Sequence, residues 1–298
     1  MTRTIGVMAM EHIAVGLVEE HQLVGAKRVF PDTQSEYDSL AAMPADEIAQ
    51  GIARQIQEVA QGGDVAAIGV GFPGIIREGV VEDSPNLQQS KGQRLGEQLM
   101  SLLAAKGLGA PVFILNDADA IAAGIAATLG HLDNFIRVWA LGSGVGFGRY
   151  PLAEGVWENG HAVVSLDPKE TFCRCGGVGH LEGIVGRRAM RLRFLDLEPE
   201  EVFAHAREGD QRCVEFVKMW HRALAAATAN SVHAGGPGKF FISGPHAKFV
   251  ETNLLDAYLH EMVKMSPLQG SSFEIVPTSD ETAIIGAAVS AAHSAGAL

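Results

Sequence analysis

The order of strand and helix signals constrains the fold of this chain more than any other feature of its sequence. Short runs rich in β-branched residues alternate with longer stretches in which apolar residues recur at helical spacing. The first part of the chain predicts strands at 4–10, 12–19, 22–30, 65–71 and 111–115, and helices at 45–60, 93–107 and about 119–129. Short breaks separate the three opening strands, which indicates an antiparallel meander. The predicted order is therefore β-β-β-α-β-α-β-α.

A similar order begins again after residue 130. Strand 135–141 is followed by a glycine turn and by irregular strand material. The remaining elements are expected as helices near 183–195, 200–207, 211–230, 246–265 and about 280–295, and as strands at 239–243 and 273–276. A duplicated α/β unit predicts two lobes with a cleft between them, and ligands favour clefts of that kind.

Composition and charge narrow the class of protein. Hydrophobic residues make up 47% of the 298 residues and charged residues 19%, which is enough to fill the core of one large domain or two ordinary ones. The net charge of −12 argues against a nucleic-acid surface. No apolar run approaches about 20 residues, so no membrane span is expected. Three cysteines and a strand-like opening segment, rather than a signal peptide, favour a reducing, cytoplasmic compartment.

Segment 158–182, ENGHAVVSLDPKETFCRCGGVGHLE, gathers ligand-type side chains. The four that suit a metal ion are His161, Cys173, Cys175 and His180. Cys173 and Cys175 are too close in sequence for an easy disulfide, whereas two thiolates and two imidazoles suit a closed tetrahedral zinc site. A closed site has no open position for catalysis, so the ion is expected to be structural. The alternative is two buried thiols and two surface histidines.

Two other stretches carry possible ligand-binding chemistry. The run 142-GSGVGFG-148 follows a predicted buried strand, where glycine N–H groups and Ser143 could approach a phosphate. The alternative there is a tight β-turn between two strands. Asn116 and Asp117 follow strand 111–115 and precede a helix, where a carboxylate could take a proton from a substrate hydroxyl. The alternative is that Asp117 or Asp119 caps the helix.

Together these segments resemble the ROK family of bacterial sugar kinases and sugar-responsive repressors. That family has the two-lobed actin-like or hexokinase-like (ribonuclease H-like) fold. Its Glu-x-Gly-His element and its later Cys-x-Cys-Gly-x-x-Gly-Cys-x-Glu element are similar to 158-ENGH-161 and 173-CRCGGVGHLE-182. His180 stands in place of the third cysteine, which gives a Cys2His2 set. Other segments resembling the family are 69-GVGFPGII-76, 85-PNL-87, 116-NDAD-119, 142-GSG-144 and 286-GAA-288.

The resemblance implies a role for each matching residue. Asp117 would be the general base that takes the proton from a sugar hydroxyl as it attacks the γ-phosphate of ATP, with Mg2+ present. The implied sugar ligands are Asn116, Glu158, His161 and Glu182. The implied nucleotide-binding residues are Gly142, Ser143, Gly144 and Gly244. His161 would serve twice, with one ring nitrogen on zinc and the other facing the sugar.

The expected organisation follows from the same resemblance. Residues 1–116 would form the N-terminal lobe, completed by a C-terminal helix at about 283–298, and residues 117–282 would form the C-terminal lobe with the zinc loop. A sugar substrate is the expected small-molecule partner. A homodimer is expected, with no nucleic acid and no membrane as partners.

The chain departs from the family at its first turn. The family carries Asp-x-Gly-Gly-Thr between its first two strands, where the loop cradles phosphates and the aspartate helps to hold magnesium. Here 6-GVMAMEHIAVGLVE-19 places Met8 at the aspartate position and lacks the glycine pair. Segment 149–157 is several residues shorter than the family's hairpin, and 244-GPH-246 replaces a run of glycines.

These departures leave two further hypotheses beside the kinase. A sugar-binding protein without kinase activity would fit the missing first phosphate loop. A DNA-binding repressor fits less well, because such relatives carry an N-terminal helix-turn-helix and this chain is expected to begin in a strand at Thr4.

Overall fold

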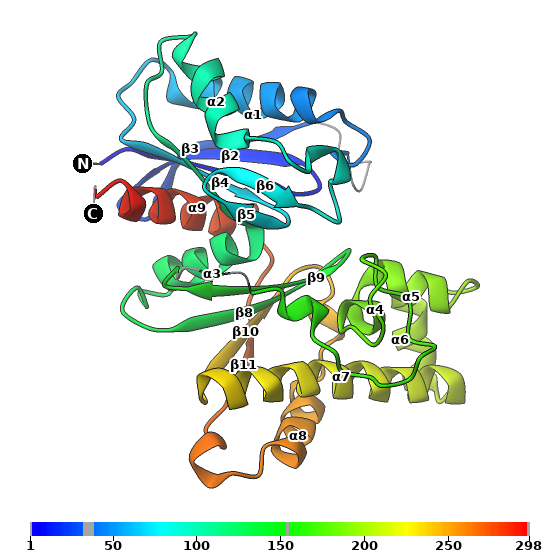
Figure 1. Cartoon of the computed structure of the whole chain (residues 1–298). Coiled ribbons are helices and arrows are strands. Elements are labelled where there is room, and N and C mark those ends of the chain that lie inside the picture. Colours follow the sequence, from blue (N-terminus) through cyan, green and yellow to red (C-terminus); the bar gives the residue numbers. More distant parts are fainter. Residues whose placement is uncertain (1, 32–38, 153–154, 156, 297–298) are drawn as a thin grey trace. The chain divides into compact units, whose positions relative to one another are not determined.

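The computed structural model of the chain describes residues 2–31, 39–152, 155 and 157–296 (Figure 1). The chain divides into two compact units, Met1–Ile136 with Gly148–Val156 and Ser279–Leu298, and Arg137–Phe147 with Trp157–Thr278. The sequence analysis expected a boundary at residue 116. In the structure, residues 117–136 belong to the first unit, because the helix that begins at Asp117 packs against the last helix of the chain. Residues 297–298 of the expected C-terminal helix, and residues 153, 154 and 156 of the shortened hairpin, lie outside the described residues.

The first unit is built on a five-stranded sheet with the order β3-β2-β1-β4-β7. Its strands are β1 (Thr4–Ala9), β2 (Ile13–Glu19), β3 (Gln22–Phe30), β4 (Ala67–Phe72) and β7 (Val112–Asn116). Strands β1 to β3 form the predicted antiparallel meander, and β1, β4 and β7 are parallel. Parallel strands end at one edge of a sheet, so the residues that follow β1, β4 and β7 share that edge.

Two layers of helices cover this sheet, one on each face (Figure 1). Helices α1 (Ala45–Ala60) and α2 (Leu95–Ala104) lie on one face, and α3 (Asp117–Thr128) and α9 (Asp280–Ser294) on the other. The strand period of two explains the division, because Val7 of β1 packs in the core with α1 whereas Met8 packs in the core with α9. Gly6 lets α9 approach closely, since a Cβ there would collide with the carbonyl of Ile284.

The second unit has a four-stranded sheet with the order β11-β10-β8-β9. Its strands are β8 (Ile136–Leu141), β9 (Val145–Tyr150), β10 (Lys239–Ser243) and β11 (Ser272–Ile275). Its helices are α4 (Glu182–Val185), α5 (Arg187–Arg193), α6 (Pro199–Glu208), α7 (Gln211–Gly235) and α8 (Thr252–Met262). Two buried tryptophans fix α7 in the core: Trp139 of β8 donates to Thr228 Oγ1 over 3.0 Å, and Trp220 of α7 donates to the carbonyl of Val185 over 3.3 Å.

The structure confirms most of the predicted elements and changes four. A short hairpin, β5 (Ile75–Arg77) with β6 (Val80–Asp83), was not predicted, because its strands are too short to show a pattern. The predicted helix 183–195 is two helices, since the backbone at Gly186 is extended. The predicted helix 246–265 is a 3₁₀ turn at Ala247–Phe249 followed by α8, and His221 accepts the N–H of Glu251 between them.

The fourth difference lies in the second copy of the repeat. Among the described residues, its third strand is reduced to one isolated bridge, Val163 with His180. The segment between β9 and α4 instead forms a loop with a 3₁₀ turn at Asn159–His161. Its glycines and its cluster of ligand-type side chains disfavour a regular strand, and none is found in the part of this segment that the structure describes.

Candidate metal centre and active-site residues

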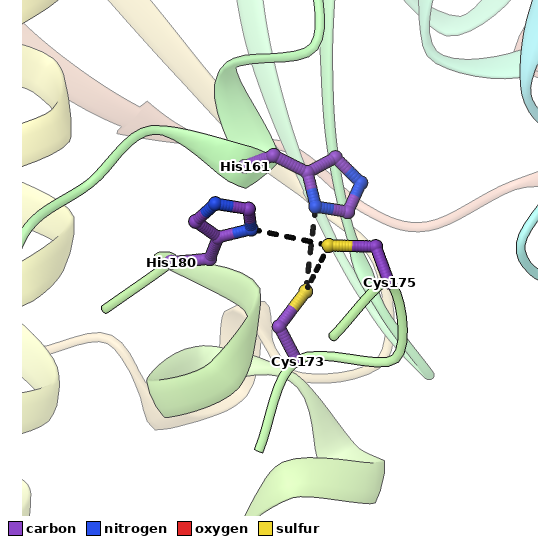
Figure 2. A group of neighbouring side chains, drawn as sticks. All are labelled: His161, Cys173, Cys175 and His180. Atoms are coloured by element: carbon purple, nitrogen blue, oxygen red, sulfur yellow. Dashed lines mark hydrogen bonds between the residues drawn. The ribbon is translucent and has the colours of Figure 1, made fainter. Parts of the chain in front are cut away.

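The four ligand-type side chains of segment 158–182 converge in the second unit (Figure 2). His161 Nδ1 lies 3.3 Å from Cys173 Sγ, the two sulfurs lie 3.4 Å apart, and His180 Nδ1 lies 3.2 Å from Cys175 Sγ. All four ligand atoms lie within 4.8 Å of one another. Ideal tetrahedral zinc, with Zn–S of about 2.3 Å and Zn–N of about 2.0–2.1 Å, places neighbouring ligand atoms about 3.3–3.8 Å apart. The donor set and its spacing therefore fit a zinc ion.

The local backbone holds these ligands in place. The bridge between Val163 and His180 joins the start of the loop to its end. Gly177 lies against the imidazole of His180, where any side chain would collide with the ring. Short-range contacts and glycine, rather than an apolar core, therefore shape the loop, which is the situation in which a bound ion contributes most to order.

Burial changes the proton affinity of two of the ligands. Burial raises the pKa of the Cys173 thiol above its usual value, and the nearby carboxylate of Glu182 raises it further. Burial also lowers the pKa of His180, as does the neighbouring His161. A neutral imidazole is the form that binds a metal, and a cation at this centre would convert the thiols to thiolates.

Two carboxylates flank the cluster. Glu158 Oε2 lies 3.9 Å from His161 Nε2, so the imidazole turns Nδ1 toward the sulfurs and Nε2 toward an acid. Burial raises the pKa of Glu158, Glu182 raises it further, and His161 lowers it. Glu182, the first residue of α4, accepts the N–H of Val145 at Oε2 over 3.1 Å. The loop thus presents two acids and an imidazole, which together can bind the hydroxyl groups of a polyol.

In the first unit, the carboxyl end of β7 carries Asn116 and Asp117. The helix cap of α3 is Asn116, whose Oδ1 accepts the N–H groups of Ala118 over 2.9 Å and Asp119 over 3.4 Å. Its Nδ2 donates to the carbonyl of Gly74 over 2.9 Å. Asp117 Oδ1 also accepts the N–H of Ala118 over 2.9 Å. The N-cap is therefore Asn116 and not Asp117 or Asp119, the two caps that the sequence offered, although Asp117 also accepts an N–H of the first turn.

Asp119 has a different contact. Its Oδ1 accepts the backbone N–H of Arg149 over 2.9 Å. This bond lies within the first unit, because the end of β9 from Gly148 onward belongs to that unit. Asp117 and Asp119 are thus neighbouring carboxylates with different partners, and Asp119 provides a control for any experiment on Asp117.

The glycine run after β8 is a tight turn between β8 and β9. The N–H of Gly142 donates to the carbonyl of Gly144 over 3.0 Å, and the carbonyl of Ser143 accepts the N–H of Arg188 over 3.3 Å. Gly244, after β10, has a φ of +98°, and a Cβ there would also collide with the carbonyl of Leu141. The predicted nucleotide-binding residues thus directly follow β8 and β10, which are neighbouring strands of one sheet.

The turn between β1 and β2 differs from a glycine-rich phosphate loop. Only residues 10–12 connect the strands, since Ala9 pairs with Ile13. Met8 is buried against Gly71 and Ala120. An apolar thioether thus fills the position at which the family described above carries a magnesium-directed aspartate.

Sequence reasoning missed two charged networks in the second unit. Arg187 bridges Glu198 and Glu200, and Glu200 also pairs with Lys248. Burial raises the pKa of Glu200, but a backbone hydrogen bond and these two cations together lower it to about 2. The second network joins Arg193 to Glu170. Neither has a local sequence signal, because the partners are 11 or more residues apart.

Comparison with known proteins places the chain among sugar kinases. A model of the ROK family matches residues 7–293. A glucokinase of Pyrobaculum calidifontis is 33% identical over 255 residues, covering 78% of this chain and 81% of that protein. A glucokinase of Thermotoga maritima is 30% identical over 311 residues, covering 92% of each. The ROK hexokinase of Thermus thermophilus has a similar structure, with a TM-score of 0.77, 22% identity and coverage of 99% of both chains.

The structural match confirms the predicted mixed α/β fold of the actin-like and hexokinase-like class. Within the part of the chain that the structure describes, no helix combines the length and apolarity needed to cross a bilayer. The family match over residues 7–293 and the two relatives show that this chain belongs to the ROK family.

Proposed function

We propose that this ROK-family protein is an ATP-dependent kinase that phosphorylates glucose or a closely related hexose, N-acylhexosamines included. The observation that carries the proposal is the identity of 30–33% to two glucokinases over 78% and 92% of the chain. The set of acids beside the Cys/His cluster supports it, because two carboxylates and an imidazole can pair with several sugar hydroxyls at once.

Asp117 is the proposed general base. It would accept the proton of the attacking sugar hydroxyl while the oxygen bonds to the γ-phosphorus and ADP leaves. Asp117 is the first residue of α3 and directly follows the parallel strand β7. This position suits a carboxylate base, because the helix dipole favours a negative charge there. Asn116 is proposed to contact the sugar as well, through its Nδ2 group, because its Oδ1 accepts the capping bonds.

Glu158, His161 and Glu182 are the proposed sugar ligands. Each would accept or donate hydrogen bonds to hydroxyl groups, and a site built to pair those groups rejects sugars that lack them. Zinc is proposed as the structural ion held by His161, Cys173, Cys175 and His180. Its role would be to fix the loop, so that the imidazole and the two acids keep their positions.

The nucleotide is proposed to bind at Gly142, Ser143, Gly144 and Gly244. Backbone N–H groups and the serine hydroxyl are suitable donors to phosphate oxygens. Bound Mg2+ would neutralise the charge that develops on the phosphates. Because Met8 cannot direct that ion, the affinity for Mg-ATP is expected to depend more on the second unit than it does in relatives that keep the aspartate.

A catalytically impaired sugar sensor is the second candidate, and the specific observation behind it is the buried Met8 near the end of β1. The sequence relatives favour the kinase. Titration calorimetry separates the two. Binding of a hexose together with Mg-ADP or Mg-ATP at millimolar concentration supports the kinase, and hexose binding without any nucleotide binding supports the sensor.

The remaining assignments follow from the same proposal. A cytoplasmic location is proposed, because ATP and free thiols are both found there and the three cysteines form no disulfide. A homodimer is proposed by resemblance to the family. Nucleic acid and membranes are not proposed as partners, in keeping with the net charge of −12.

A further inference from the structure

Arg193, the last residue of α5, forms a nearly buried ion pair with Glu170 in the metal-binding loop. Its two terminal nitrogens lie 3.1 and 2.5 Å from the two carboxylate oxygens, so the pair is bidentate. The side chains are only 19% and 10% exposed. The guanidinium also lies over the ring of Phe172, 4.4 Å from its centre. Bidentate pairs of this kind are short, directional and much stronger than exposed ones.

The same guanidinium reaches the far end of the loop. Arg193 Nη2 donates to the carbonyl of Gly183 over 3.4 Å. Gly183 directly follows Glu182 and packs so closely on Cys173 that a Cβ would lie 2.9 Å from the backbone nitrogen of that cysteine. One side chain therefore joins the segment before the first cysteine to the residue after Glu182, across the base of the loop.

Neither partner of this pair is one of the four candidate metal ligands. Cys175 and His180 lie at the outer part of the loop, where the metal would hold them. The backbone carbonyl of Glu170 accepts the N–H of Gly179 over 2.7 Å. This bond links the ion pair to the loop backbone without involving a metal ligand. Two features would thus hold the loop: the proposed ion among the four ligands, and the ion pair at its base.

We propose that Arg193 is a positioning residue for Glu182, and that it acts through the carbonyl of Gly183 independently of the metal. This inference rests on the proposed role of Glu182 as a sugar ligand. The fork of the guanidinium is essential, because one side chain must bind two carboxylate oxygens and a carbonyl at once, and a lysine has no fixed fork with which to do so.

Arg193→Met tests the proposal, with Arg222→Met as the matched control. Arg222 also pairs through two nitrogens with a carboxylate, that of Glu261, and its guanidinium lies 4.9 Å from the ring centre of Tyr258. This second pair, however, is about half exposed. We expect Arg193→Met to raise the KM for the sugar roughly tenfold or more while kcat changes less than about twofold. The zinc content should equal that of the wild type, and Arg222→Met should leave all three values unchanged.

A double variant separates positioning from folding stability. Replacing Arg193 alone leaves the carboxylate of Glu170 buried without its partner, which destabilises the fold. Glu170→Met together with Arg193→Met removes that unpaired charge and should recover the melting temperature. The KM for the sugar should nevertheless stay raised, because the bond from Arg193 to the carbonyl of Gly183 is still missing. Recovery of both values would overturn the proposal, since Arg193 would then act through stability alone.

The amide of Val145 gives a readout that needs no enzymatic activity. Its N–H is bonded to the carboxylate of Glu182, so its hydrogen exchange measured by NMR reports whether that carboxylate stays in place. We expect exchange roughly tenfold faster in Arg193→Met and in the double variant, and unchanged in Arg222→Met. If the wild type phosphorylates no sugar, the proposed function fails, whereas this result still decides the inference. Exchange that is the same in all variants would overturn it.

Discussion

His12 Nε2 lies 3.3 Å from Asp280 Oδ1, which joins the turn after β1 to the first residue of α9 across 268 positions of sequence. Lys27 Nζ lies 2.6 Å from the other carboxylate oxygen. The turn between β1 and β2, which has no glycine pair, is thus held to α9 by the charged pair of His12 and Asp280. Asp280 also lies at the positive end of the helix dipole, where an acid is stabilised.

This contact predicts a pH window of stability. The hydrogen bond with His12, helped by the one with Lys27, lowers the pKa of Asp280 to about 2. The contribution of the ionised Asp280 to stability is therefore present above about pH 4 and is lost as the pH falls toward 2. The same bond raises the pKa of His12, so its contribution is full below about 6.5 and is lost as the pH rises through the raised value. The pair therefore stabilises the fold most between about pH 4 and 6.5.

His12→Gln is expected to lower the free energy of unfolding at pH 5 by on the order of 0.5–1 kcal/mol, because both groups are partly exposed. At pH 8.5 the loss should be much smaller. Urea unfolding followed across pH 4–9 measures this, with the exposed His233→Gln as control. A loss that is constant across that range would show that the charge of His12 is not what stabilises the turn.

The metal cluster predicts one zinc ion for each chain. Plasma emission spectroscopy of the pure protein should find it, and chelation should lower the melting temperature, because the loop has little apolar packing of its own. His180→Ala should lose zinc affinity, whereas His180→Cys should keep the ion, since a thiolate is an equally good fourth ligand. Cys213→Ser is the control, because that cysteine is buried outside the cluster. Protein with no zinc and no response to chelators would refute the metal site.

The two acids of the loop predict a selective loss of sugar affinity. Glu158→Gln and Glu182→Gln should each raise the KM for the sugar by roughly tenfold or more, because a neutral amide replaces an acceptor-only group that pairs with hydroxyls. The affinity for Mg-ADP, measured by calorimetry, should stay within about twofold. The same substitution at Glu261, in the half-exposed pair with Arg222, serves as control. An equal loss of sugar and nucleotide affinity would indicate general disruption of the fold instead.

Local patterns predicted the elements and the proximity of the four Cys and His side chains well. The strands are marked by β-branched runs, and compact spacing brought His161, Cys173, Cys175 and His180 together as expected. Their proximity could be predicted because a short loop limits how far its residues can separate. The family motifs added the residue roles, which stay predictions.

Contacts between segments that are distant in sequence could not be predicted from the sequence. Asp280 and His12 meet only because α9 packs across β1, and Arg193 meets Glu170 only because α5 folds back on the loop. The contact of Glu182 with the N–H of Val145 depends likewise on where α4 begins. Pairings of this kind are decided by tertiary packing, for which a single sequence carries no periodic signal.

The most direct test of the central proposal compares sugar phosphorylation by the wild-type protein and by Asp117→Asn. Wild-type protein, Mg-ATP and a panel of hexoses and hexosamines, followed by 31P NMR, should yield one sugar phosphate for each ADP with at least one sugar. Asp117→Asn should lower kcat about 10²–10⁴-fold while calorimetry still detects sugar binding, because the base is lost and the sugar ligands remain. Asp119→Asn, which changes the carboxylate that accepts the N–H of Arg149, should keep most of the activity. Undiminished turnover in Asp117→Asn, or no sugar phosphate from any sugar in the panel, would contradict the account.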